Sequence, residues 1–209
     1  MMMGEGVAMP EPISFYFDFA SPYAYLAATQ IEAMADRCGR AVDWRPILLG
    51  AVFKSTGSQP LLQVPLKGPY LQRDVPRFAR LLHVPLHMPL PVPFAALAAA
   101  RGVYWLLDRG DAHRAKAFAL AVFQAHWADG RDMALPENVL DVAAGLEIDR
   151  AALEAGMTDP AVKQRLRQET DDAIARGVFG APFFIVDGEP FWGVDRLPQL
   201  ERWLQTGGW

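Results

Sequence analysis

Residues 13–25 read Ile-Ser-Phe-Tyr-Phe-Asp-Phe-Ala-Ser-Pro-Tyr-Ala-Tyr, and this stretch decides the fold. Its first half alternates apolar residues with Tyr16, Asp18 and a serine, and this period of two predicts a β-strand. Ser21 and Pro22 then indicate a helix start, because serine favours the N-cap and proline the first helical position. We expect the strand to lead directly into a helix. Ser21 would then lie where amide N–H groups face a crevice, unless it is a cap and nothing more.

The composition is that of a globular protein with one domain, large enough to carry an inserted lobe. The chain has 209 residues, of which 52% are hydrophobic, and a net charge of -4. That charge and the lack of a basic run speak against nucleic-acid binding, and no apolar run is long enough to span a membrane. The start of the chain does not resemble a signal peptide, so we expect a cytoplasmic protein. Cys38 is the single cysteine, and the histidines show no metal-ligand spacing, so we expect no bound metal.

After the first helix, the sequence predicts a second strand, an irregular loop and then a series of helices. Residues 41–47 alternate as the second strand, which Pro46 places near a sheet edge. Residues 49–70 contain several glycines and prolines and predict an irregular loop that includes Lys67. A proline-rich connector is expected at 85–93. The predicted helices cover residues 70–82, 94–107, 112–127, 136–144, 150–155 and 160–176.

The end of the chain returns to strand character. Residues 183–186 and 190–192 predict two strands joined by a hairpin turn at Asp187 and Gly188. Asp195 is placed to cap a last helix. The order predicts an α/β domain formed by residues 12–48 and 177–206, interrupted by a connecting loop and helical domain at 49–176.

This order of elements resembles a thioredoxin-like fold with a large all-helical insertion, as in the DsbA-like proteins. In those proteins the active site lies at the start of the first helix, opposite a cis-proline that precedes the third strand. Ser21 stands where a redox Cys-x-x-Cys would begin, and Ala181-Pro182 matches the cis-proline. The resemblance therefore implies a cis bond between Ala181 and Pro182.

Three segments together carry a narrower resemblance: residues 15–26, 177–183 and 192–197. They resemble the 2-hydroxychromene-2-carboxylate isomerase family, which is related to kappa-class glutathione transferases. The resemblance implies a glutathione-dependent isomerase of aromatic hydrocarbon catabolism. Its small aromatic carboxylate substrate would be interconverted with trans-o-hydroxybenzylidenepyruvate. The family also implies a homodimer.

The resemblance assigns a glutathione site. Ser21 would hydrogen-bond the glutathione sulfur and act as the catalytic residue, while the backbone of Ala181, with Pro182, would pair with the tripeptide. Asp195 would hold the γ-glutamyl end, and Lys67 would approach a carboxylate of glutathione or substrate. A helix cap and a solvated lysine are the alternatives for these last two residues.

Two positions depart from the family pattern. Val194 stands where a polar residue often precedes the aspartate, and Ser58 stands in place of a loop asparagine. Val194 removes one side-chain polar contact that the family pattern would include, and both changes bear on the affinity for glutathione and on the identity of the substrate.

The implied reaction uses a thiolate, which a serine hydroxyl and helix amides favour over the thiol. The sulfur adds reversibly to the substrate, the chromene ring opens, a single bond rotates and the thiolate leaves. A kappa-like glutathione transferase would share the same thiolate site. A non-catalytic interaction module that kept the fold is the alternative from another class.

Overall fold

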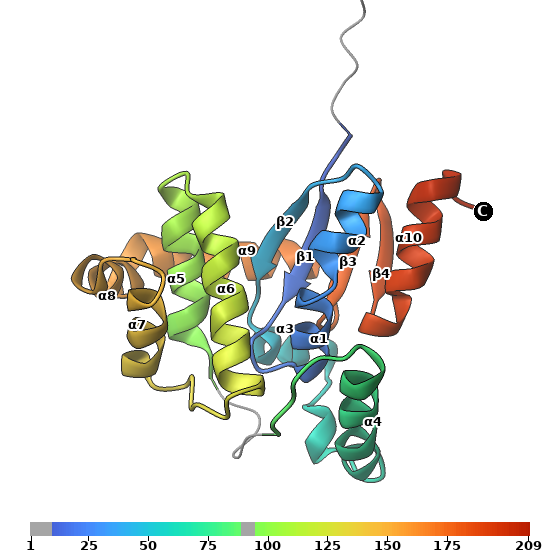
Figure 1. Ribbon diagram of the computed structural model, residues 1–209, viewed down its shortest axis with the longest axis horizontal. Helices are drawn as coiled ribbons and strands as arrows, with labels where there is room; N and C mark the ends of the chain where they lie inside the picture. Colours follow the sequence, from blue (N-terminus) through green and yellow to red (C-terminus); the bar gives the residue numbers. More distant parts are fainter. Residues whose placement is uncertain (1–9, 89–94) are drawn as a thin grey trace, which may run out of the picture.

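The computed structural model describes residues 10–88 and 95–209. A four-stranded sheet in the order β2-β1-β3-β4 forms its centre (Figure 1). β1 pairs parallel with β2, whereas β3 pairs antiparallel with both β1 and β4. The strands are β1 (Ile13–Phe17), β2 (Val42–Pro46), β3 (Phe183–Val186) and β4 (Glu189–Trp192).

Helices cover the sheet and form a lobe beyond β2 (Figure 1). The helices that adjoin the strands in sequence are α1 (Pro22–Ala28), α2 (Ile31–Arg37), α3 (Leu49–Thr56) and α10 (Leu197–Thr206). Two 3₁₀ turns are η1 (Leu61–Gln63) and η2 (Val194–Arg196). The others are α4 (Lys67–Leu81), α5 (Leu97–Asp108), α6 (Ala112–Trp127), α7 (Pro136–Ala144), α8 (Arg150–Thr158) and α9 (Pro160–Ala175). No helix in the described ranges is both long and apolar enough to cross a membrane.

The alternation of β1 buries both of its faces. Phe15 and Phe17 belong to the main core with α1, α2 and the helical lobe. Tyr16 points to the opposite face and packs in a second cluster with Val52 of α3 and Ala173 of α9. β1 is thus the central strand of a sheet covered on two sides, as the run of aromatic residues requires.

Polar side chains of the lobe are hydrogen-bonded to the sheet domain. The Tyr104 hydroxyl donates to the carbonyl of Pro46 at 2.8 Å, at the end of β2. Trp127 Nε1 donates to the carbonyl of Phe19 at 2.9 Å, just beyond β1. Both rings are buried, and a buried Tyr or Trp normally finds such a partner. These bonds fix the lobe against the carboxyl ends of β1 and β2.

The predicted α/β fold with a helical insertion is confirmed, as are the edge position of β2 and the hairpin between β3 and β4. The division at residues 48 and 177 into two domains stays a prediction. The connector predicted at 85–93 and the helix start at residue 94 fall partly outside the described residues.

The irregular loop predicted at 49–70 is confirmed only for residues 57–66, which hold no regular element except η1. At its two ends the prediction is wrong, because residues 49–56 form α3 and Lys67 is the first residue of α4. The start of α3 is stabilised by partners distant in sequence: the N–H of Leu49 donates to Asp18 Oδ2 at 2.8 Å, and that of Leu48 donates to Thr170 Oγ1 at 3.2 Å. Tertiary contacts of this kind override the weak local propensity of a glycine-containing segment.

Two further predictions are corrected. The helical spacing of Ala24, Ala28, Ile31 and Ala35 predicts one helix after Ser21, but that helix ends at Ala28 and a separate α2 begins at Ile31. Asp195 does not cap the last helix: it lies in η2, and its carboxylate pairs with Arg196 at 2.8 Å. α10 begins at Leu197 with no side-chain cap, because η2 leads directly into it.

We predict that Gly156→Ala lowers the free energy of unfolding by about 1–3 kcal/mol through overpacking. Gly156 lies in α8, and a Cβ there would overlap the Trp105 indole of α5. Urea unfolding followed by circular dichroism measures the change. Gly145→Ala is the matched control, since its Cβ would come no closer than 3.4 Å to any atom. Equal stability of the two variants would contradict this packing argument.

Candidate active site

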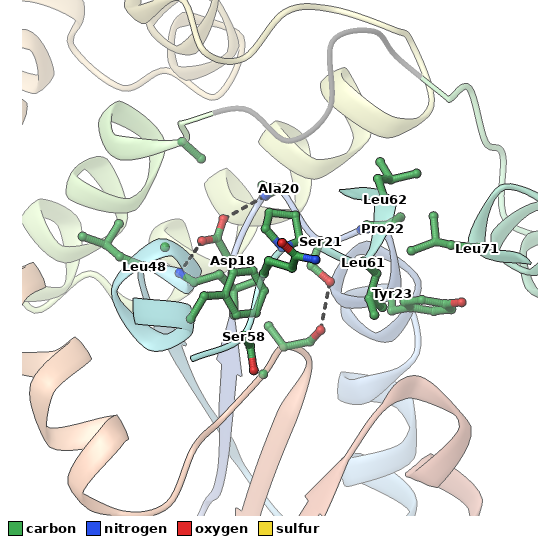
Figure 2. Close-up of a pocket in the computed structure, with 18 of the residues that line it drawn as sticks. Asp18, Ala20, Ser21, Pro22, Tyr23, Leu48, Ser58, Leu61, Leu62 and Leu71 are labelled. Atoms are coloured by element: carbon green, nitrogen blue, oxygen red, sulfur yellow. Dashed lines mark hydrogen bonds between the residues drawn. The ribbon is translucent and has the colours of Figure 1, made fainter. Parts of the chain in front are cut away.

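A cavity of about 800 Å³ opens where β1 meets α1 (Figure 2). Its walls come from segments far apart in the chain: the β1–α1 turn, α3, the segment around η1, the start of α4, Trp127 of α6 and the residues before β3. Most lining side chains are apolar, with a small number of polar groups. Such a composition is typical of a small-molecule site.

Ser21 is the N-cap of α1, as predicted, and it is buried in the cavity wall. Its Oγ accepts the backbone N–H of Ala24 at 3.2 Å. The same hydroxyl donates to the carbonyl of Ala181 at 2.9 Å, a bond that joins residues 160 positions apart (Figure 2). Ser21 therefore both caps the helix and contacts the residue before Pro182.

Asp18 is a buried carboxylate three residues before Ser21. Its Oδ1 accepts the N–H of Ala20 at 2.9 Å, and its Oδ2 accepts the N–H of Leu49 at 2.8 Å (Figure 2). Burial raises the pKa of Asp18, and the two backbone hydrogen bonds lower it only in part. In the sequence Asp18 is a polar residue of the alternating strand pattern, and no local pattern predicts that its side chain holds α3 against the turn.

Tyr23 links α1 to α4. Its hydroxyl donates to Asp74 Oδ2 at 2.7 Å, and Arg77 donates to the other carboxylate oxygen. Burial raises the pKa of Tyr23, and the hydrogen bond to Asp74 raises it further. Burial alone would raise the pKa of Asp74, but the hydrogen bonds from Tyr23 and Arg77 lower it below its usual value. The helix that begins at Lys67 is therefore fixed to the helix that begins beside Ser21.

Lys67 lies at the cavity and is exposed. It is the one basic side chain among the described residues that line the cavity, and it forms no ion pair with any of them. A cation on an otherwise apolar wall is suited to an anionic ligand.

An aromatic pair forms another part of the cavity wall. Phe179 and Trp192 contact edge to face with ring centroids 4.9 Å apart, and both are partly exposed. Gly180 lies beneath the indole, where a Cβ would be 2.5 Å from Trp192 Nε1. The close approach of this ring to the backbone therefore requires glycine.

The structure brings three of the five predicted site residues to one cavity: Ser21, Lys67 and Ala181. Pro182 follows immediately, and the Ala181–Pro182 bond is cis, which confirms the expectation for this bond. Asp195 does not line the cavity, although it is close enough to Tyr23 for its charge to raise the pKa of that tyrosine. Ser58 does line it.

The sequence predicts that Trp127 is a packed helix residue. It is buried, as expected, but it also lines the cavity. Core packing is the favoured prediction for Trp44, Phe53, Tyr104 and Trp105, with an aromatic substrate pocket as the alternative. Phe53 lines the cavity, whereas the other three do not. An apolar helix stripe has the same pattern whether it faces a core or a cavity, so no sequence signal separates the two.

Comparison with known proteins identifies a family and several relatives that are similar to this chain. The family model of the DSBA-like thioredoxin domain matches residues 12–205. A 2-hydroxychromene-2-carboxylate isomerase of Sphingobium xenophagum is 33% identical over 198 residues, which cover 94% of this chain and 99% of the relative. Human glutathione S-transferase kappa 1 is 26% identical over 223 residues, with 94% of each chain covered.

A solved structure supports the same relationship. The selenomethionine form of a 2-hydroxychromene-2-carboxylate isomerase superposes with a TM-score of 0.84 at 32% identity. The superposition covers 92% of this chain and 94% of that one. The similarity therefore extends over both the sheet and the helical lobe.

We predict that Tyr23→Phe lowers the free energy of unfolding by about 1–2 kcal/mol at neutral pH, since it removes a hydrogen bond to a charged group. Because the pKa of Asp74 is lowered in the folded protein, its stabilising effect is complete above the unfolded-state pKa and is lost as pH falls through the folded-state value. The difference from the unmodified protein should therefore shrink below about pH 4.

Urea unfolding at several pH values tests this expectation. In an Asp74→Asn background, where no carboxylate ionises at that position, the effect of Tyr23→Phe should no longer depend on acid pH. A difference that persists unchanged in strong acid would contradict the role of the ionised Asp74.

Proposed function

The chain belongs to the DSBA-like thioredoxin domain family and, within it, to the 2-hydroxychromene-2-carboxylate isomerases, and from this membership we propose that it is a glutathione-dependent isomerase. The proposed reaction interconverts 2-hydroxychromene-2-carboxylate and trans-o-hydroxybenzylidenepyruvate, a step of aromatic hydrocarbon catabolism. The named relatives support the isomerase activity, and the kappa transferase relatives support glutathione as the thiol.

One observation carries the proposal: the Ser21 hydroxyl lies in the cavity wall and donates to the carbonyl of Ala181. A hydroxyl group can rotate, so the same proton can be donated to a thiolate in the cavity instead. The carbonyl of Ala181 then needs another donor, because an unpaired buried acceptor costs about 1–3 kcal/mol. A peptide N–H is a suitable replacement, which is what a bound tripeptide offers.

The residues present fit glutathione. Ala181 lines the cavity, and within the described residues its N–H donates to no acceptor, so both of its backbone groups can pair with a peptide. The volume of about 800 Å³ lies within the range of ~300–1,000 Å³ that is usual for small-molecule sites. Lys67 provides a positive charge for a carboxylate of glutathione or of the substrate.

Bound glutathione would supply a thiolate that adds reversibly to the unsaturated carbon chain of the substrate and so permits rotation about a former double bond. The protein stabilises that charge through the Ser21 hydroxyl donor and positions the reactants against Phe179 and Trp192, whose rings offer an apolar face to an aromatic ligand. No cysteine takes part, because Cys38 is not among the residues that line the cavity.

Two residues complete the proposed glutathione site on the strength of the family resemblance. Pro182 would hold the backbone of Ala181 toward the tripeptide. Asp195 would contact the γ-glutamyl end from its position outside the cavity, near Tyr23. Its ion pair with the exposed Arg196 is weak, since exposed pairs contribute about 0–1 kcal/mol, so the carboxylate is available to a ligand.

The proposal extends to the assembly and surroundings of the protein. We infer a homodimer in the cytoplasm, with neither nucleic acid nor a membrane as a partner. The lone Cys38, a free thiol, accords with a reducing compartment.

Titration with glutathione followed by two assays tests the proposal. Isothermal calorimetry should show binding of glutathione, and turnover of 2-hydroxychromene-2-carboxylate should require it. A second assay with glutathione and an electrophile such as a halogenated nitroarene distinguishes the kappa-like transferase, which would accumulate a stable conjugate. Absence of binding at millimolar glutathione would instead favour the non-catalytic module.

We predict that Ser21→Ala lowers turnover at neutral pH about tenfold or more, because a hydrogen bond to a charged group contributes ~1.5 kcal/mol or more. Turnover should recover partly at higher pH, where glutathione ionises without help. The ultraviolet absorbance of the bound thiolate should titrate at higher pH in the variant. Loss of the cap should also cost about 1 kcal/mol of stability.

Ser55→Ala is the matched control, since Ser55 is an exposed residue of α3 that does not line the cavity. Activity without glutathione that disappears in Ser21→Ala would make Ser21 itself the nucleophile and overturn this mechanism.

We predict that Lys67→Ala raises KM for the substrate or for glutathione, while the free energy of unfolding changes by less than about 0.5 kcal/mol, as is usual for an exposed side chain. Steady-state kinetics against each ligand measures the effect. Lys54→Ala, which removes a lysine of α3 that does not line the cavity, should leave KM unchanged. Identical kinetics of the two variants would assign Lys67 to the solvated surface.

A further inference from the structure

An ionisable side chain, that of Asp18, lies close to Ser21 in the chain and has no part in the proposed thiolate chemistry. Asp18 is the single acidic side chain among the described residues that line the cavity. The N–H of Ser21 donates to the carbonyl of Asp18 at 3.0 Å, so residues 18–21 form a tight turn. This turn holds the carboxylate and the hydroxyl in the wall of one cavity (Figure 2).

The Asp18 carboxylate is fixed in place but is not neutralised. Each of its oxygens accepts one backbone N–H, from Ala20 and from Leu49, and no cation pairs with it within the described residues. An ionised carboxylate has about four lone-pair sites, so acceptor capacity remains on both oxygens. The residue is only 8% exposed, and it lines the cavity. A proton donor bound there could reach it.

We propose that Asp18 is a catalytic residue that carries the proton when the cyclic hemiketal of the substrate opens. This inference rests on the proposed function, because it takes 2-hydroxychromene-2-carboxylate as the ligand. In that molecule C2 bears both a hydroxyl group and the ring oxygen. Ring opening therefore needs a proton to leave the hydroxyl group and a proton to reach the ring oxygen.

One carboxylate can perform both transfers. Asp18 accepts the proton of the C2 hydroxyl, and the O–H electron pair becomes the second bond of the new C2 carbonyl. The bond between C2 and the ring oxygen breaks, and its electron pair stays on that oxygen as a phenolate. Asp18, now a carboxylic acid, gives the same proton to the phenolate. The carboxylate is restored, and nothing is oxidised or reduced.

The surroundings of Asp18 suit this task. Burial raises its pKa, and a catalytic acid–base group works best when its pKa is near the working pH. The other titratable side chains that line the described part of the cavity are Tyr23 on α1 and Lys67 on α4. Neither contributes to the change in the pKa of Asp18, which comes from burial and from backbone hydrogen bonds.

The test separates ring opening from thiolate chemistry. The probe is 2-hydroxychroman-2-carboxylate, a hemiketal that lacks the carbon–carbon double bond and so cannot take up a thiolate. Exchange between its closed and open forms is followed by NMR with the full chain and without glutathione. The unmodified protein should accelerate this exchange. Asp18→Asn should reduce the acceleration about 100-fold or more, the usual contribution of general acid–base catalysis.

Asp132→Asn is the matched control. Asp132 Oδ1 accepts the N–H of Ala134 at 3.0 Å, the same two-residue turn that Asp18 forms with Ala20, but it lies on the exposed surface. This variant should accelerate exchange as the unmodified protein does. A folded Asp18→Asn variant with full acceleration would overturn the inference.

The unmodified protein provides a test even where Asp18→Asn does not fold. Its acceleration should depend on one ionisation above the usual pKa range of aspartate, and either no acceleration over buffer or a rate independent of pH would overturn the proposal. Failure of the protein to bind glutathione would contradict the proposed function but not this measurement, so the two can fail separately.

Discussion

The site depends on how the chain leaves β1. Two backbone N–H groups, one within the turn and one at the start of α3, converge on the buried carboxylate of Asp18. Without this acceptor, the N–H of Leu49 at the start of α3 would have no hydrogen-bond partner in the protein. The same carboxylate accepts the N–H of Ala20 within the turn that places Ser21 at the start of α1. One side chain therefore determines where two walls of the cavity meet.

Stability and ligand binding make opposite demands on the hydroxyl of Ser21. In the free protein it satisfies the carbonyl of Ala181 and accepts from Ala24, so it joins two parts of the fold. To donate a hydrogen bond to a sulfur atom, the hydroxyl would have to give up one of these bonds. A ligand that brings its own amide donor can replace the lost bond, and a ligand without one cannot. The proposed role of Ser21 therefore suits a peptide thiol better than a simple thiol.

The sequence predicted those features of the fold that depend on local pattern. Alternation identified β1 and β2, and the serine–proline pair identified the start of α1 at Ser21. It could not predict α3, whose start is stabilised by Asp18 and Thr170 from distant parts of the chain. For the same reason the cavity role of Trp127 was missed. Lys67 was assigned from family resemblance, while its position at the cavity follows from how α4 packs against Tyr23.

The contact between Gly180 and the Trp192 indole has a consequence for how such chains can diverge. Any side chain at 180 would displace the ring, so a first change at that position removes one wall of the cavity. A smaller residue at 192 would release the constraint and make room at 180. Residue 180 precedes β3 in the chain and residue 192 follows it. The two positions should therefore covary among descendants of this chain. The order of changes is also constrained, with the tryptophan replaced before the glycine.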